Sequence, residues 1–107
     1  NTLPGKPDIV FRKYRAAIFV HGCFWHGHSC RLFKWPATRK KFWADKIKEN
    51  RRRDLFVGAQ LLDAGWRVGT VWECSIKGQS DKQIARVIAR CAKWLSGKRR
   101  SIDLGSR

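Results

Sequence analysis

Apolar and polar residues follow one another in short blocks along the chain, and the first blocks predict a β-hairpin. Mainly apolar runs cover residues 8–11 and 16–20, and the polar, basic segment 12–15 joins them. Runs of this length, separated by a few polar residues, are typical of paired antiparallel strands. Residues 66–72 are rich in β-branched and aromatic side chains and predict a third strand.

A long stretch from about residue 39 to residue 64 carries apolar residues at roughly helical spacing. Thr38 is the expected N-cap of this helix, and Gly65 stands where a glycine commonly ends one. Gly58, inside the stretch, indicates a kink or a break. The apolar positions are Phe42, Ile47, Leu55, Leu61 and Leu62.

A second helix opens with Ser80-x-x-Gln83, the pattern of a capping box. Its apolar stripe consists of Ile84, Val87, Ile88, Cys91, Trp94 and Leu95. The order of strand, strand, loop, helix, strand and helix predicts an α/β fold, with a small mixed β-sheet flanked by helices. A chain of 107 residues provides one domain of this kind, which we place at residues 1–97. Residues 98–107 are expected to form a basic, flexible tail.

The charge of the chain indicates a polyanionic partner. Lys and Arg number 24 against 8 Asp and Glu, which gives a formal net charge of +16. No apolar run approaches the roughly 18 residues of a membrane-spanning helix, so nucleic acid is favoured over a membrane. Binding of this kind weakens steeply with salt, because each neutralised phosphate releases counterions.

Cysteines and histidines cluster in the segment that follows the hairpin. Cys23-x4-His28-x-Cys30, together with Cys74 at the end of the third strand, makes a closed set of three sulfurs and one imidazole. Such a set suits structural Zn²⁺ and a reducing cytosol, whereas the alternative is a group of reduced, buried cysteines. Spacing does not decide which of the nearby histidines is the ligand. Cys91 lies on the apolar stripe of the second helix and is expected to be a core residue.

Three further residues are candidates for chemistry, each with an ordinary alternative. His26 has a side chain suited to acid–base work near neutral pH, or it is a hydrogen-bonding surface residue. Asp54 lies in the basic run 51–54, where a carboxylate usually forms a salt bridge and less often orients a histidine. Asp8 opens the first strand, where it serves either as a turn residue or as a Mg²⁺ ligand.

Aromatic residues are interleaved with cations between residues 24 and 43. In DNA-binding proteins such aromatic side chains stack on bases or wedge between base steps, while cations such as Lys34 and Arg39 hold phosphates. Packing in the core is the alternative for some of them. The aromatic residues concerned are Phe24, Trp25, Trp35 and Trp43, whereas Trp66, Trp72 and Trp94 are assigned to the core.

Several separated motifs resemble, in order and spacing, those of the very short patch repair endonucleases. The resemblance runs from about residue 4 to residue 95. It implies a fold related to the type II restriction nucleases and a nick 5′ to the thymine of a T:G mismatch in double-stranded DNA. The matching motifs are Pro4-Gly5-Lys6-Pro7-Asp8, Ile18-Phe19-Val20-His21-Gly22-Cys23-Phe24-Trp25-His26, Pro36-Ala37-Thr38-Arg39-x-x-Phe42-Trp43, Gly65-Trp66-Arg67-Val68 and Val71-Trp72-Glu73-Cys74.

The resemblance also implies roles for individual residues. Asp8 matches the aspartate that binds catalytic Mg²⁺, and the main-chain carbonyl of Val20 would be a further ligand. Val20 stands where a hydroxyl-bearing residue is common, a change that a main-chain ligand tolerates. His26 matches the histidine that activates water, Asp54 the aspartate that orients it, and His21 a second active-site histidine. The implied zinc ligands are Cys23, His28, Cys30 and Cys74, and the implied DNA wedge is Phe24, Trp25 and Trp43.

Members of the family carry an N-terminal helical segment before the first motif, and this chain is expected to lack it. We expect a monomer that acts on DNA in the bacterial cytoplasm, associated with the nucleoid when bound. Two alternatives stay open at this point. One is a related nicking nuclease of a homing or phage system, and the other is a zinc-stabilised DNA-binding module without catalysis.

Overall fold

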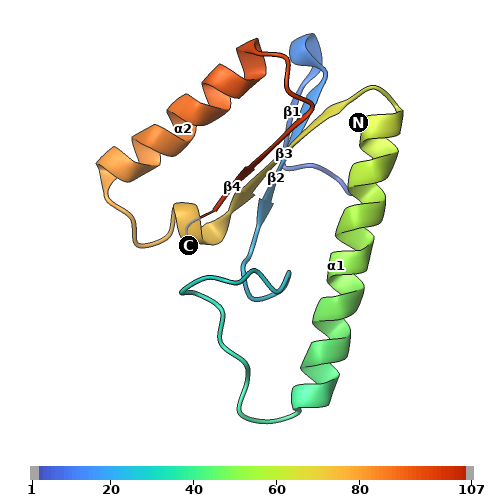
Figure 1. Ribbon diagram of the computed structural model, residues 1–107, viewed down its shortest axis with the longest axis vertical. Helices are drawn as coiled ribbons and strands as arrows, with labels where there is room; N and C mark the ends of the chain where they lie inside the picture. Colours follow the sequence, from blue (N-terminus) through green and yellow to red (C-terminus); the bar gives the residue numbers. More distant parts are fainter. Residues whose placement is uncertain (1–2, 106–107) are drawn as a thin grey trace.

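The computed structural model describes residues 3–105 as one sheet between two long helices (Figure 1). The helices α1 and α2 lie on opposite sides of the sheet, and the Cys/His segment lies beyond one end of the strands. In chain order the elements are β1 (Ile9–Phe11), η1 (Arg12–Tyr14), β2 (Ala16–His21), α1 (Lys40–Asp63), β3 (Arg67–Trp72), η2 (Glu73–Ser75), α2 (Asp81–Ser96) and β4 (Ser101–Leu104).

The four strands lie in the order β1-β2-β3-β4. β1 and β2 form the expected antiparallel hairpin, with Ile9 opposite Ile18. β2 pairs with β3 in parallel, and β3 pairs with β4 in parallel. The sheet is therefore mixed, and the predicted α/β class is confirmed.

Each face of the sheet packs against one helix. Ala16 and Ile18 of β2 belong to a buried cluster with Trp94 of α2. The alternate residues Ala17 and Phe19 belong to a second cluster, with Leu61 of α1. Because successive side chains of a strand point to opposite faces, a strand between two helices is apolar on both faces, as β2 is from Ala16 to Val20.

Helix α1 differs from the sequence prediction at its start and agrees with it at its end. Arg39, not Thr38, precedes the first turn; it has left-handed backbone dihedrals (φ 53°, ψ 42°) and makes no side-chain capping bond. At the other end Gly65 has φ 88°, its N–H donates to the Leu62 carbonyl and the next N–H donates to the Leu61 carbonyl. This is the Schellman motif that a glycine makes possible. The helix continues through Gly58 without a break.

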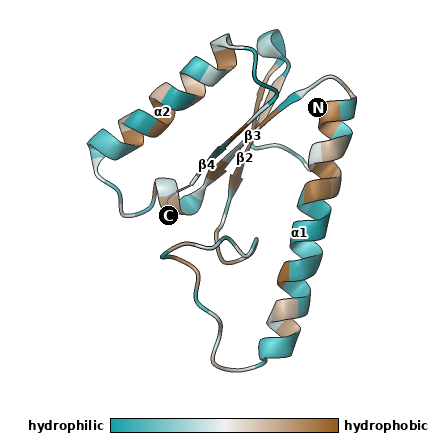
Figure 2. Ribbon diagram, in the orientation of Figure 1, coloured by the Kyte–Doolittle hydropathy of each residue, from teal (hydrophilic) through white to brown (hydrophobic). Residues whose placement is uncertain are grey.

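The apolar residues of α1 do not form one buried stripe. Ile47 and Leu61 are buried, whereas Phe42 is 44% and Leu55 78% exposed. Figure 2 shows a mostly hydrophilic helix on its lower half, which lies beside the Cys/His segment instead of the sheet. The N-terminal half of α1 is therefore available to support that segment.

Helix α2 begins as predicted, since the Ser80 hydroxyl accepts a hydrogen bond from the Gln83 N–H at 3.2 Å. Of the predicted stripe, Val87, Cys91, Trp94 and Leu95 belong to the cluster on this face of the sheet, whereas Ile88 is 64% exposed. Cys91 packs against the buried cluster on this face, as expected of a core cysteine, and burial raises the pKa of its thiol. Within residues 3–105 no helix is both long enough and apolar enough to cross a membrane.

The prediction of a flexible tail after residue 97 is wrong for residues 101–104, which form β4. Leu104 is only 2% exposed and belongs to the same buried cluster as Trp94. The Arg67 side chain donates to the carbonyls of Leu95 and Arg99, and so joins the end of α2 to the approach to β4. Side-chain burial and parallel pairing with β3 therefore order a segment whose composition is polar. Residues 106 and 107 of the predicted tail lie outside the described part of the chain.

Candidate active site and metal centre

A cleft of about 620 Å³ opens between α1 and the sheet, and four residues predicted to act in catalysis line it. Asp8 comes from the start of β1, His21 from the end of β2, His26 from the following loop and Asp54 from α1. An enzyme of the expected kind requires that these side chains converge on one cavity. The fold brings them together from segments almost fifty positions apart in sequence.

His26 and Asp54 form a hydrogen-bonded pair across the cleft. His26 Nδ1 lies 2.5 Å from Asp54 Oδ2, and both side chains are partly buried. An ionised carboxylate only accepts, so Nδ1 carries the proton in this pair. In the neutral ring Nε2 is then the acceptor, the state that a general base needs.

His21 lies directly against His26. The two imidazole rings are stacked, with centroids 4.0 Å apart and planes 6° apart. Burial lowers the pKa of His21, the neighbouring His26 lowers it further, and the carboxylates of Asp54, Asp8 and Asp103 act in the opposite direction. Its buried Nδ1 has no hydrogen-bond partner among residues 3–105.

Asp8 is held at the mouth of the same cleft by the β-hairpin. Its N–H donates to the Ile18 carbonyl, and its Oδ2 accepts from the Val20 N–H at 2.7 Å. The carboxylate therefore lies beside the main chain of Val20, whose own side chain is 45% exposed. A carboxylate and a main-chain carbonyl at neighbouring positions are hard oxygen donors that suit Mg²⁺, which usually keeps several waters as well.

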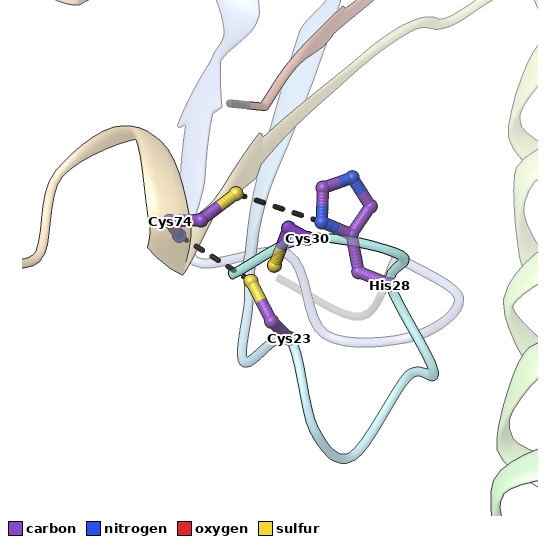
Figure 3. A group of neighbouring side chains, drawn as sticks. All are labelled: Cys23, His28, Cys30 and Cys74. Atoms are coloured by element: carbon purple, nitrogen blue, oxygen red, sulfur yellow. Dashed lines mark hydrogen bonds between the residues drawn. The ribbon is translucent and has the colours of Figure 1, made fainter. Parts of the chain in front are cut away.

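A second cluster consists of Cys23, His28, Cys30 and Cys74, which point toward one another (Figure 3). Their donor atoms all lie within 4.8 Å of one another. His28 Nδ1 lies 3.5 Å from Cys74 Sγ, and the Cys74 N–H lies 3.3 Å from Cys23 Sγ. Cys91 is outside the cluster, and all four cysteines are free of disulfides.

The geometry and chemistry of this cluster fit Zn²⁺. Metal–ligand bonds of about 2.3 Å to sulfur and about 2.0 Å to nitrogen place tetrahedral donors roughly 3.5–3.8 Å apart. Burial raises the pKa of the Cys23 thiol to about 12, and side-chain hydrogen bonds with Cys30 and Cys74 add to this, while the Cys74 main-chain bond opposes it. Such a thiol becomes a thiolate at neutral pH when a cation replaces its proton.

Arg31 and Glu73 join the loop of this cluster to η2. The Arg31 guanidinium donates to the carbonyls of Cys74 and Lys77, at 3.1 and 2.6 Å. Glu73 Oε1 accepts from the Cys23 N–H at 3.4 Å. The main-chain N–H of Cys23 and the main-chain carbonyl of Cys74 are thus each hydrogen-bonded to a side chain.

Gly27 lies between His26, which lines the cleft, and His28, which belongs to the cysteine cluster. Its φ is 62°, and a Cβ built there would lie 2.6 Å from Ile47 Cγ2 on α1. Asn50, only 7% exposed, adds a hydrogen bond from its Nδ2 to the Trp25 carbonyl at 2.9 Å. The loop therefore packs closely on α1 at a position where a side chain does not fit.

The residues predicted to insert into DNA form one aromatic cluster beside this loop. Phe24, Trp25 and Trp43 contact one another edge to face, with ring centroids 5.4 to 5.6 Å apart. Trp25 is 50% exposed, whereas Phe24 and Trp43 are partly buried. Lys34 and Arg39 are exposed, and the Arg39 guanidinium lies 4.2 Å from the centre of the Phe42 ring.

The sequence of this chain is similar to those of known proteins. A family profile described as DNA mismatch endonuclease Vsr matches residues 1–32. Over 103 residues the chain is 45% identical to the DNA mismatch endonuclease Vsr of Escherichia coli (strain K12), an alignment that covers 96% of this chain and 66% of that protein. The chain belongs to the Vsr family.

Two other relatives of this Vsr-family chain are named as nicking enzymes. It is 53% identical over 74 residues to the Type II nicking enzyme V.XorIIP of Xanthomonas oryzae pv. oryzae (strain KACC10331 / KXO85), covering 69% of this chain and 54% of the relative. It is 45% identical over 76 residues to the Type II nicking enzyme V.NmeAIP of Neisseria meningitidis serogroup A / serotype 4A (strain DSM 15465 / Z2491), covering 71% and 54%. The chain therefore spans between about half and two thirds of the length of these relatives.

Two residues of this Vsr-family site were not anticipated from sequence. Asp103 lines the cleft from β4, in a segment whose polar composition predicted a tail. Trp72, assigned to the core, lines the cleft as well and is only partly buried. The alternation of Ile102 and Leu104 is the one signal of a strand around Asp103, and it is too short to distinguish a strand from a loop.

Proposed function

We propose that this chain is the catalytic core of a DNA-nicking endonuclease of very short patch mismatch repair, which hydrolyses the phosphodiester 5′ to the thymine of a T:G mismatch. The observation that carries the proposal is the placing of Asp8 in the same cleft as the hydrogen-bonded pair of His26 and Asp54. The names of its relatives, a DNA mismatch endonuclease and nicking enzymes, support the reaction and the substrate class.

The proposed roles in hydrolysis follow from the donors and acceptors of the cleft. His26 takes a proton from the attacking water at Nε2, while Asp54 holds Nδ1–H and so fixes the tautomer. The water oxygen bonds to phosphorus as the bond between phosphorus and the leaving oxygen breaks. His21, stacked on His26, limits the positions that the His26 ring can take and borders the phosphate site.

Two metal ions have different proposed roles. Asp8 and the main-chain carbonyl of Val20 would hold Mg²⁺, which supplies polarisation of the phosphate and stabilisation of the leaving oxygen when bound. Cys23, His28, Cys30 and Cys74 would hold Zn²⁺, and a closed set of four protein ligands is typical of a structural ion. In the catalytic core we include residues 101–104 together with 1–97, because β4 contributes to the cleft.

The partner is double-stranded DNA with a T:G mismatch, bound by a monomer in the bacterial cytoplasm and on the nucleoid. The formal charge of +16 supplies attraction to the backbone in any sequence. Phe24, Trp25 and Trp43 insert beside the mismatch, and Lys34 and Arg39 contact phosphates. A mismatched step costs less to unstack than a paired one, which gives the aromatic cluster its selectivity.

The proposal is tested by incubating this chain with labelled T:G and T:A duplexes in Mg²⁺. Nicking of the T:G duplex alone, lost with EDTA and in Asp8→Asn and His26→Ala, is the expected result. Asp45→Asn is the matched control, since Asp45 lies on α1 and is 67% exposed in a surface ion pair with Lys41.

Other results point to other functions. Salt-sensitive binding of both duplexes, without nicking of either one, would overturn the catalytic proposal in favour of a DNA-binding module. Nicking of fully paired DNA at one sequence would replace mismatch repair by a homing or phage nuclease activity. Zinc content does not distinguish these outcomes, so the nicking assay decides among them.

A further inference from the structure

Trp72, the last residue of β3, lies between the cysteine cluster and the stacked histidines. Its ring is stacked on His28, with centroids 4.1 Å apart and planes 10° apart. It meets the rings of His21 and His26 edge on, at 5.1 and 6.1 Å between centroids. One indole therefore contacts a proposed zinc ligand and both histidines of the cleft.

Asp103 determines how this indole is oriented. Trp72 Nε1–H donates to the Asp103 carboxylate, with Oδ1 at 3.0 Å and Oδ2 at 3.1 Å. The indole has a single donor and no acceptor, so this contact satisfies its polar group completely. Parallel pairing of β3 and β4 places Asp103 opposite Thr70, one strand away from Trp72 on the same sheet.

The backbone after β4 encloses the stacked rings of Trp72 and His28. A Cβ on Gly105 would lie 2.8 Å from His28 Cε1 and 3.0 Å from Trp72 Cδ1. Close packing of the main chain against both rings leaves little room for either to turn. The stack is therefore held by a hydrogen bond at the indole nitrogen and by backbone contact at the ring edges.

We propose that Trp72 and Asp103 are a positioning pair that couples the zinc cluster to the catalytic histidines. The inference rests on the proposed function, and neither residue is assigned a step in the chemistry. Asp103 fixes the indole, the indole fixes the ring of His28 by stacking on it, and its T-shaped contacts limit the rings of His21 and His26. Residues that orient metal ligands from outside the coordination sphere typically alter metal affinity or activity by about 10–100-fold when replaced.

The test uses Trp72→Phe, Asp103→Leu and Asp103→Asn. Trp72→Phe keeps an aromatic ring but loses the N–H, Asp103→Leu removes the acceptor, and Asp103→Asn retains an acceptor oxygen. We expect about tenfold lower kcat on the T:G duplex with unchanged KM in the first two variants, and at least partial recovery in Asp103→Asn. Zinc transfer to a chromophoric chelator should be about tenfold faster in the same two variants.

A readout independent of nicking separates this inference from the proposed function. Histidine ring nitrogens are followed by long-range ¹H–¹⁵N NMR, and the His21, His26 and His28 signals should all shift in Trp72→Phe and Asp103→Leu. The matched control is Trp66→Phe, which replaces a 9% exposed core residue just before β3 that does not line the cleft. It should lower the free energy of unfolding and leave zinc transfer and the histidine signals unchanged.

The inference is overturned if Trp72→Phe and Asp103→Leu behave like Trp66→Phe, with reduced stability but unaltered zinc transfer and histidine signals. Recovery that is no better in Asp103→Asn than in Asp103→Leu would also overturn the role given to the hydrogen bond. If the unaltered protein does not nick DNA, the proposed function fails, while the zinc and NMR measurements still decide whether the pair positions the rings.

Discussion

The imidazole rings of His21 and His26 lie face to face, 4.0 Å between centroids, yet among residues 3–105 only His26 of the two is hydrogen-bonded to a carboxylate. We therefore expect replacement of His26 and replacement of His21 to have different effects on nicking. His26→Ala removes the proposed base and should reduce single-turnover nicking to background. His21→Ala removes one wall of the His26 site and should reduce nicking by about 10–100-fold, with DNA affinity retained. Equal losses in the two variants would contradict this assignment.

Replacement of Asp54 tests the orienting bond to His26 directly. Asp54→Asn substitutes an amide that can present a donor to Nδ1 and so favour the wrong tautomer. The corresponding change in a catalytic triad costs about 10⁴-fold, and we expect about 10²–10⁴-fold slower nicking here, less than for Asp8 or His26 variants. Single-turnover rates and duplex affinity check this. An affinity loss equal to the rate loss would instead assign Asp54 to DNA binding.

Gly27 and Gly58 provide opposite predictions for the same substitution. Gly27→Ala places a Cβ 2.6 Å from Ile47 at positive φ, and should lower the free energy of unfolding by about 1–3 kcal/mol. Gly58→Ala lies within α1, and among residues 3–105 no atom other than the adjacent helix backbone lies within 4 Å of the new Cβ, so this change should raise stability by up to about 1 kcal/mol. Urea unfolding of both variants measures the difference. A neutral Gly27→Ala would mean that the loop does not pack on α1 as described.

The cysteine cluster predicts which thiol matters for zinc. Cys74→Ser should reduce zinc content from about one ion per chain toward zero and lower Tm, because a structural ion contributes its binding free energy to folding. Cys91→Ser, outside the cluster, is the control and should retain the ion. Zinc content measured by elemental analysis, with thermal unfolding, tests both. Retention of a full equivalent by Cys74→Ser would exclude Cys74 as a ligand.

Trp25 is the most exposed member of the proposed DNA wedge, and its loss should affect binding more than folding. Trp25→Ala removes a ring that is half exposed, so Tm should change little. Stacking of an aromatic ring on a base contributes about 1–3 kcal/mol, which predicts roughly 5–150-fold weaker binding to the T:G duplex. Phe56→Ala, 64% exposed on α1, is the control. Fluorescence anisotropy at fixed salt compares the two.

Local sequence patterns were sufficient for the hairpin, the start of α2 and the glycine that ends α1. Each of these depends on residues a few positions apart: the capping box at Ser80, the Schellman motif at Gly65 and the two apolar runs, joined by a short polar segment, that form β1 and β2. The Cys/His segment was also recognisable as an irregular loop, because it has no period. Thr38 failed as a cap because Arg39 takes left-handed dihedrals and the chain enters the helix from another direction.

What the sequence did not reveal depends on contacts between distant segments. β4 forms because Leu104 packs into a core formed by β2, β3 and α2. No residue near Leu104 in the sequence predicts that it is buried. Asp103 and Trp72 likewise line the cleft because segments that are distant in sequence pack together. Of the site itself, His26 and Asp54 were open to ordinary interpretations until the family resemblance was considered, and their 2.5 Å contact is a product of how α1 crosses the loop.

The position of β4 in the chain has a consequence for biosynthesis. All four cysteine-cluster residues lie at or before Cys74, so they leave the ribosome well before Asp103 does. Translation adds about 5–20 residues per second, so under the proposed function the four ligands would meet zinc while β4 is still inside the ribosome. The cleft is completed only when residues 101–104 add to the sheet. A nascent chain on the ribosome would then bind Zn²⁺ before its cleft is complete and before it can cut DNA.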